Sequence, residues 1–239
     1  MEFFDKQFQA LRSFMQVKKD QGVVKEFTRQ EKSWPKGGNR NLVLEQDMAV
    51  ELGNPQTEST SFMLWENDSG TIRDNHISII GPDLNEATDI RLPFGKIVLV
   101  GGKDFTPDNA YNRYREMEAI RYDIDLKGYM MRAASQYQRE WSRVSKEALN
   151  DGFSLVTLGS TLIDRFKEKP FVTAVEVILI TSNKADILAV KEVSEQSMRI
   201  ISAMNKMAEE MSFDCDACEY VDVCSDVAAL RSMRDNMDK

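Results

Sequence analysis

The chain has 239 residues, 42% hydrophobic and 29% charged, which is typical of a globular protein with one large or two small domains. Its formal net charge of -8 argues against non-specific nucleic-acid binding, because neutralising phosphates takes a surplus of lysine and arginine. No apolar run approaches the roughly 20 residues that a membrane-spanning helix needs. An odd number of cysteines, and a start without the basic and apolar regions of a secretion signal, predict a cytoplasmic protein.

Residues 1–38 are predicted to form an N-terminal helical segment and a linker. Apolar residues at three- and four-residue steps predict a helix over residues 3–28, and a proline with two glycines marks the linker at 34–38. The helix is expected to present one apolar stripe, made of Phe4, Phe8, Leu11 and Met15.

Residues 39–212 are predicted to form one α/β (α+β) domain that begins with a small antiparallel sheet. The sheet is expected from three β-like runs between turn signals, at residues 42–50, 61–65 and 77–80. His76, the only histidine, lies at the third run, where a structural role is the default expectation.

The remainder of this domain is predicted to be a layer of alternating strands and helices. An uninterrupted apolar run predicts a buried strand at residues 95–101, and a Thr-Pro pair after it predicts the start of a helix. Further elements are expected at residues 162–169 (helix), 172–181 (strand) and 183–211 (helix).

Residues 130–149 are predicted to form an amphipathic helix on which an apolar stripe with Trp141 lies beside a basic stripe. The basic side chains suit the phosphates of a nucleotide, and Trp141 offers a stacking surface for adenine. The alternatives are a core position for Trp141 and surface ion pairs of the arginines with Glu116, Glu118 or Glu140. The candidate ligand-binding residues are Arg139, Trp141, Arg143 and Lys146.

All three cysteines lie within ten residues, as Cys215, Cys218 and Cys224. This C-x-x-C-x-x-x-x-x-C spacing favours a soft metal or an iron–sulfur cluster, with one coordination position left for another ligand. The alternatives are zinc bound by the three thiolates with His76 or an acid, a redox-active dithiol, and inert buried thiols. Residues 213–239 are predicted to hold this cysteine motif and a C-terminal helix.

Four segments together resemble acetyl-CoA synthase, the nickel–iron–sulfur subunit of the carbon monoxide dehydrogenase/acetyl-CoA synthase complex. The resemblance extends from about Val50 to Cys224 and covers the middle domain of that family and the opening of its cluster domain. The segments are Glu51-Leu-Gly-Asn-Pro, Ile80-Gly-Pro-Asp-Leu84, Trp141-Ser-Arg-Val-Ser-Lys-Glu-Ala148 and the cysteine motif.

The resemblance implies that Cys215, Cys218 and Cys224 bind a [4Fe–4S] cluster, and that Trp141 and Arg143 match a motif linked to CoA. The fourth cubane cysteine and the Cys-Gly-Cys nickel site of the family have no counterpart, so no nickel centre and no acetyl-CoA synthesis by the chain alone are expected.

The expected function is that of a stand-alone iron–sulfur protein, an accessory in anaerobic one-carbon and CoA metabolism that binds CoA or a corrinoid one-carbon protein. Two alternatives remain at this point. One is an enzyme whose three-cysteine cluster binds a small substrate at an open iron, which would act as a Lewis acid. The other is a zinc-stabilised or metal-free interaction module.

Overall fold

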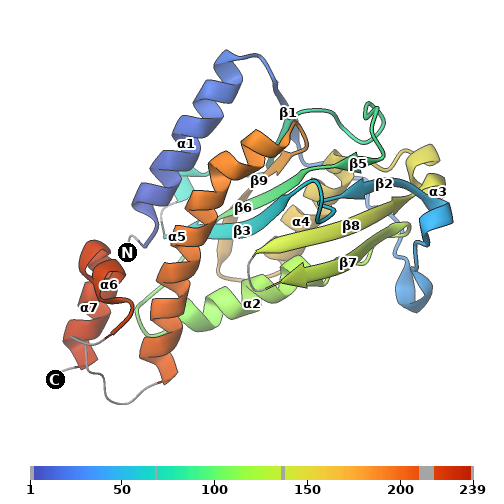
Figure 1. Ribbon diagram of the computed structural model, residues 1–239. Helices are drawn as coiled ribbons and strands as arrows, with labels where there is room; N and C mark the ends of the chain where they lie inside the picture. Colours follow the sequence, from blue (N-terminus) through green and yellow to red (C-terminus); the bar gives the residue numbers. More distant parts are fainter. Residues whose placement is uncertain (1–2, 68, 136–137, 210–217, 238–239) are drawn as a thin grey trace.

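The computed structural model describes residues 3–67, 69–135, 138–209 and 218–237, which form a five-stranded and a four-stranded β-sheet flanked by helices (Figure 1). This mixture of helices and strands confirms the predicted α/β class.

The five-stranded sheet has the order β1-β4-β9-β6-β3. Its β4–β9 and β3–β6 pairs are parallel, and its β1–β4 and β6–β9 pairs are antiparallel. β6 and β9 are almost continuously apolar because the inner strands of this sheet are covered on both faces. The strands are β1 (Val24–Thr28), β3 (Ser59–Glu66), β4 (His76–Ile80), β6 (Phe94–Gly102) and β9 (Val172–Ile180).

The four-stranded sheet has the order β5-β2-β8-β7, in which β7 and β8 form an antiparallel hairpin. The two sheets meet where the backbone N–H of Ser61 donates to the Gln138 carbonyl (2.6 Å) and that of Glu140 donates to Ser59 Oγ (3.2 Å). The strands are β2 (Met48–Leu52), β5 (Arg91–Leu92), β7 (Tyr129–Ser135) and β8 (Arg139–Ser145).

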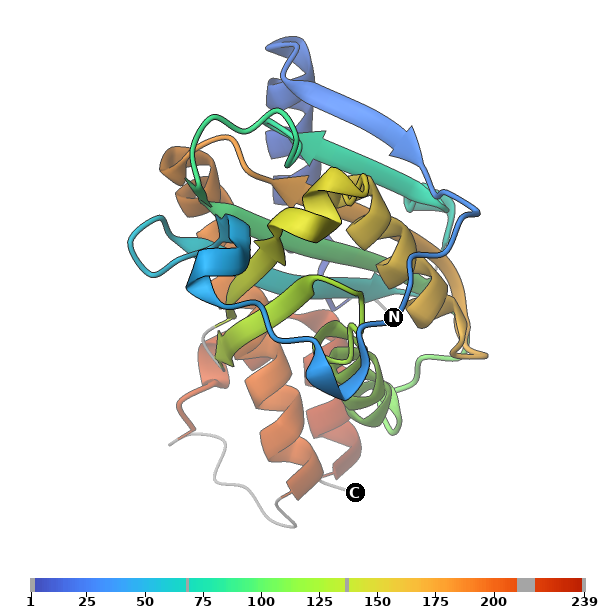
Figure 2. The same cartoon turned by 90° about the vertical axis from the view of Figure 1, so that its right-hand side faces the viewer.

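Helices cover both faces of the five-stranded sheet. α4 packs on β4 and β9, whereas α5 packs on β3 from the opposite side with α1 beside it (Figures 1 and 2). No helix in the described part of the chain is long and apolar enough to span a membrane. The helices are α1 (Asp5–Asp20), α2 (Ala110–Tyr122), α3 (Lys146–Asn150), α4 (Leu155–Lys167), α5 (Lys184–Glu209), α6 (Val221–Asp226) and α7 (Ala228–Met237).

The predicted strands at 95–101 and 172–181 correspond to β6 and β9, and the predicted long helix corresponds to α5. The prediction that the runs at residues 42–50, 61–65 and 77–80 pair with one another as an antiparallel sheet is wrong. β2 belongs to the second sheet, β3 pairs with β6, and β4 lies between β1 and β9. The N-terminal helix also ends at Asp20, and the edge strand β1 follows it. Domain boundaries after residues 38 and 212 stay a prediction.

The predicted helix at residues 130–149 is wrong, because this segment forms β7, β8 and the short helix α3. Along β8, Glu140, Ser142 and Val144 share one buried face of the strand, and on the other face only Arg143 is buried. Glu140 forms an ion pair with the fully buried Lys96, so a carboxylate that a hydrophobicity pattern places outside lies inside.

The Ile80-Gly-Pro-Asp-Leu84 motif joins the ends of β4 and β9 to the start of α4. Gly81 has φ of +107°, and a Cβ there would lie 2.5 Å from the backbone nitrogen of Ser182. The Asp83 carboxylate accepts hydrogen bonds from the backbone N–H groups of Leu84 (2.6 Å) and Leu155 (2.8 Å). This motif therefore has a structural role in placing the helix on the sheet.

Candidate functional site

Two of the sequence motifs contact each other at Glu51, which is buried in β2. Its carboxylate accepts hydrogen bonds from Arg143 Nε (3.0 Å), Asn54 Nδ2 (2.7 Å) and Arg91 Nε (3.2 Å). Burial opposes ionisation of Glu51, but the hydrogen bonds from Arg143 and Asn54 outweigh it and hold its pKa below the usual value. The Glu51-Leu-Gly-Asn-Pro turn and the Trp141–Ala148 segment thus form one unit.

Trp141 lies in a pocket of about 180 Å³ between this turn and the β7–β8 hairpin. The guanidinium carbons of Arg132 and Arg143 lie 4.3 Å and 6.0 Å from the centroid of the Trp141 ring, within the range of cation–π contacts. Trp141 Nε1 is buried close enough to Glu51 to help lower its pKa, but it makes no hydrogen bond to a described atom. The lining residues are Gly53, Pro55, Glu58, Ser59, Ala133, Ala134, Arg139, Glu140 and Trp141.

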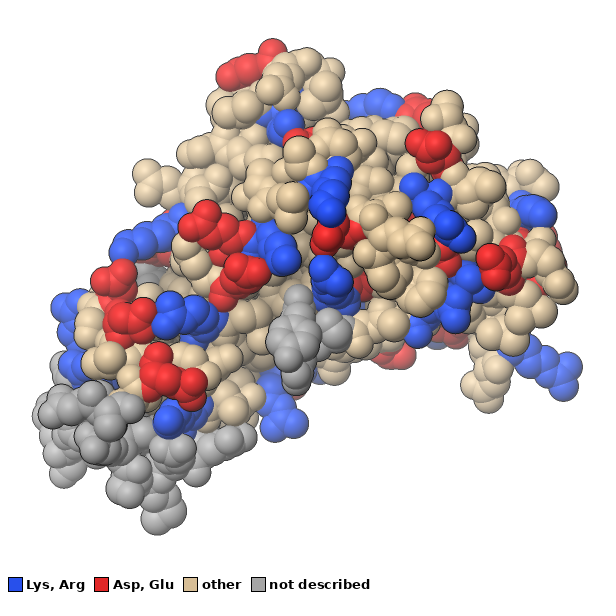
Figure 3. Space-filling model, viewed as in Figure 1, with Lys and Arg blue, Asp and Glu red and all other residues tan. Residues whose placement is uncertain are grey.

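Basic side chains also lie at the rim of the pocket, around Glu58. Arg139 Nη2 lies 2.9 Å from Glu58 Oε2, and Lys184 Nζ lies 3.2 Å from Glu58 Oε1. Burial opposes ionisation of Glu58, yet Lys184, Arg139 and Lys191 outweigh it and lower its pKa. On the face shown in Figure 3, lysine and arginine side chains are interspersed with carboxylates.

The structure brings together three of the four residues predicted to bind a ligand. Arg139, Trp141 and Arg143 alternate along β8 and therefore share one face of a strand, not of a helix. Arg139 and Trp141 line the pocket, whereas Arg143 does not line it and donates to Glu51. Lys146 lies apart in α3, is exposed, and donates to the Gln46 carbonyl (2.8 Å).

The acids expected to neutralise these arginines have other partners. Glu116 pairs with Lys169, Glu118 with Arg121 and Glu140 with Lys96. The carboxylates that pair with Arg143 and Arg139 are those of Glu51 and Glu58, respectively. Glu58, Arg132 and Lys184 also lie at the site and were not predicted from the sequence as site residues. Glu51 stood in a motif without a role, and its position in that motif was the signal that pointed to it.

A buried polar network lies on the other face of β8. Glu140 accepts hydrogen bonds from Tyr129 OH (3.0 Å) and Ser61 Oγ (3.1 Å) and is paired with Lys96 Nζ. Arg121, also buried, donates to Ser61 Oγ (2.9 Å). Burial lowers the pKa of Lys96 although Glu140 opposes this, and burial raises the pKa of Tyr129.

The cysteines are only partly within the described residues. Cys215 lies outside them; Cys218 is half-buried in the turn before α6, and Cys224 is buried in α6 with an exposed fraction of 7%. Across the described ranges, no three cysteine, histidine or acidic side chains gather as metal ligands. α6 is held to its neighbours by two exposed ion pairs, Arg199–Asp222 (2.9 Å) and Lys6–Asp226 (3.1 Å).

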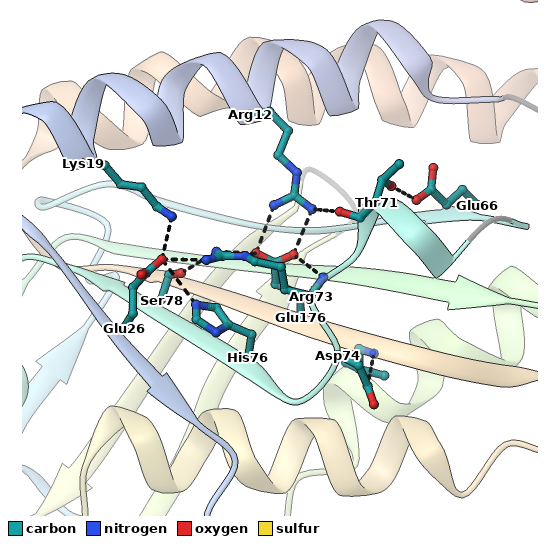
Figure 4. A network of polar contacts seen from close by, with 11 residues as sticks. Arg12, Lys19, Glu26, Glu66, Thr71, Arg73, Asp74, His76, Ser78 and Glu176 are labelled. Carbon is teal, nitrogen blue, oxygen red and sulfur yellow. Dashed lines mark hydrogen bonds and ion pairs between the residues drawn. The ribbon is translucent and has the colours of Figure 1, made fainter.

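His76, one candidate zinc ligand, belongs to an ion-pair network that joins α1 to the five-stranded sheet (Figure 4). Arg12 of α1 and Arg73 both bind the fully buried Glu176 of β9, at 2.9 Å and 2.7 Å. His76 Nε2 lies 3.4 Å from the Glu26 carboxylate, and burial together with the charge of Arg73 lowers the His76 pKa. These contacts give His76 a structural position.

Comparison with known proteins matches residues 38–187 to the family described as CO dehydrogenase/acetyl-CoA synthase complex beta subunit. The chain belongs to this family. The match confirms the predicted resemblance and includes the whole pocket around Trp141, whereas the cysteine motif lies beyond the matched residues.

The relatives have low sequence identity to this chain and are considerably longer. The acetyl-CoA decarbonylase/synthase complex subunit beta of Methanopyrus kandleri is 28% identical over 170 residues, which are 70% of this chain and 34% of that protein. Subunit beta 2 of Methanocaldococcus jannaschii is 26% identical over 179 residues, 72% of this chain and 36% of that protein. The carbon monoxide dehydrogenase/acetyl-CoA synthase subunit alpha of Moorella thermoacetica is 28% identical over 156 residues, 64% of this chain and 21% of that protein.

Proposed function

We propose that this chain binds CoA in the pocket around Trp141 and serves as an accessory to a carbon monoxide dehydrogenase/acetyl-CoA synthase system in anaerobic one-carbon metabolism. The observation that carries the proposal is the Trp141 ring, half-buried in a pocket whose surroundings include Arg132, Arg139 and Arg143. Its relatives are named as subunits of acetyl-CoA decarbonylase/synthase complexes, which supports a protein partner in such a complex, with a corrinoid one-carbon protein as a candidate.

The chemistry of the pocket suits the nucleotide end of CoA. An indole ring stacks on adenine, and arginines bind phosphate oxygens through paired N–H groups. A pocket of about 180 Å³ is smaller than sites that enclose a whole drug-sized ligand. We propose that it holds the adenine ring alone, with the phosphates at the basic rim and the pantetheine arm on the surface. Stacking requires the exposed Arg132 to shift from the Trp141 ring or to share it.

Trp141→Ala is expected to weaken CoA binding by about 1–3 kcal/mol, the usual contribution of a base stacked on an aromatic side chain. Titration calorimetry measures the affinity, and quenching of tryptophan fluorescence by CoA reports contact with Trp141. Trp34→Ala is the control, because Trp34 packs on Phe153 and does not line the pocket. Equal affinity of the wild type and Trp141→Ala would place CoA elsewhere.

For the cysteine motif we propose a [4Fe–4S] cluster bound by Cys215, Cys218 and Cys224. Thiolates are the donors that such clusters take, and the turn before α6 and α6 itself supply two of them. When bound, the cluster would supply electron-transfer or Lewis-acid chemistry at this end of the molecule. The buried position of Cys224 favours a site closed on one side.

Anaerobically purified protein is expected to contain about four iron and four sulfide per chain, and Cys218→Ala is expected to lose most of both. Elemental analysis with visible and EPR spectra measures this. Ser225→Ala, at an exposed position of α6, is the matched control and should keep its iron. Bound zinc, or no metal in the wild type, would contradict the cluster and favour the interaction module.

A further inference from the structure

Glu58 stands out at the pocket because its carboxylate lies where a ligand anion would bind. Its two oxygens contact Arg139 of β8 and Lys184 at the start of α5, and Lys191 adds a third positive charge nearby. The side chain is 17% exposed and lines the pocket beside Trp141. The cations that would hold a phosphate are therefore already engaged by a carboxylate of the chain itself.

The backbone at Glu58 is unusual for this residue type. Its φ is +71°, in the left-handed region that glycine and asparagine adopt readily and that a long side chain with a Cβ disfavours. Gln138, one of three other described non-glycine residues with positive φ, has φ of +56° and lies at the adjacent end of the hairpin, where Ser194 of α5 donates to its side chain. Strained backbone conformations cluster at ligand sites, and this turn borders the proposed one.

We infer that Glu58 competes with ligand phosphates for Arg139 and Lys184 and thereby sets the affinity of the pocket for anions. The inference rests on the proposed function, because it assumes that an anionic ligand enters this pocket. Both cations are about half exposed, at 46% and 58%, so their side chains can turn from the carboxylate to a ligand. Glu58 then acts as a specificity residue, since ligands with too little negative charge do not displace it.

The test is the binding of CoA and of uncharged adenosine to the wild type and to Glu58→Gln, measured by titration calorimetry. Glu58→Gln keeps the size of the side chain and removes its charge. It is expected to bind CoA about tenfold more tightly, because one negative charge next to the phosphates is lost, and to bind adenosine as the wild type does. The gain is expected to shrink at high salt, where exposed charges are screened.

Glu168→Gln is the matched control. Glu168 is an exposed carboxylate paired with Arg165 (2.8 Å) at the end of α4, on the opposite face of the five-stranded sheet from α5. Its replacement should leave CoA affinity unchanged.

Each remaining outcome overturns the inference in a distinct way. Equal CoA affinity in the wild type and Glu58→Gln would show that Glu58 does not compete, while the proposed function would stand. Weaker binding by Glu58→Gln would show that the carboxylate positions the cations for the ligand. Lack of CoA binding by both proteins would overturn the inference and the proposed function together.

Discussion

Glu140→Leu is expected to destabilise the protein by about 3–5 kcal/mol, the largest effect of any single change considered for this chain. Lys96 and Glu140 are both fully buried, at 0% and 1% exposure, and they form an ion pair between β6 and β8. Removing the carboxylate leaves the Lys96 ammonium group without its counter-charge and leaves Tyr129 OH without one of its acceptors. Urea-induced unfolding of the wild type and the variant measures the difference.

The double variant Lys96→Met/Glu140→Leu is the matched control. Replacing both partners of a buried ion pair by apolar side chains of similar volume is often nearly neutral, so the double variant should recover most of the lost free energy. The difference in the free energy of unfolding between the wild type and Glu140→Leu should also become smaller as the pH rises above 7. Burial already lowers the pKa of Lys96 in the folded protein, so Lys96 is more fully protonated in the unfolded chain than in the folded one. The free energy of unfolding of the variant therefore rises with pH. A double variant no more stable than the single one would contradict this interpretation.

Glu176→Gln is expected to cost about 3 kcal/mol at pH 7, at the lower end of the range for breaking a buried ion pair. The lower end applies because Arg12 and Arg73 are about one-third exposed and regain some hydration. Arg12 is one of the contacts between α1 and the sheet, so the loss should appear in unfolding by urea. Glu168→Gln is again a charge-matched control, with an exposed ion pair that contributes about 1 kcal/mol or less.

The difference in the free energy of unfolding between the wild type and Glu176→Gln should become smaller at acidic pH. Burial opposes the ionisation of Glu176, but Arg12 and Arg73 outweigh this effect and lower the pKa of Glu176. In the same network, Lys19 and Arg73 lower the pKa of Glu26 from 4.5 to about 2. Folded-state pKa values below the unfolded ones give stability that is present above pH 4.5 and is lost as the pH falls through the folded values. Unfolding at pH 7 and pH 3 compares the two proteins, and a constant difference would rule out this origin.

Elements with long, unbroken patterns could be predicted from the sequence, and elements whose pattern depends on distant partners could not. β9 and α5 have the continuous apolar run and the helical period that local physics requires. The β7–β8 hairpin has a buried carboxylate, Glu140, which is neutralised by Lys96, 44 positions earlier in the chain. Apolar residues that happened to recur at helical spacing then favoured a helix over residues 130–149.

The candidate site was predicted in its residue types and not in its geometry. Trp141, Arg139 and Arg143 were found because an aromatic residue among arginines is typical of nucleotide sites, and this holds for a strand as for a helix. Lys146 does not line the pocket, because the chain turns into α3 directly after β8. Glu58 and Lys184 come from segments that only the folded chain brings together.

The length of α5 has a consequence for any chemistry shared by the two ends of the molecule. Lys184 stands beside the pocket, and Arg199, on the same helix, contacts α6, which carries Cys224. Those 15 residues correspond to an axial rise of about 22 Å. A group bound at Trp141 and a metal bound by the α6 thiols would thus lie beside two parts of the same helix, separated by about four turns. Transfer of a chemical group between the two sites would need a flexible carrier arm long enough to span this separation of about 22 Å.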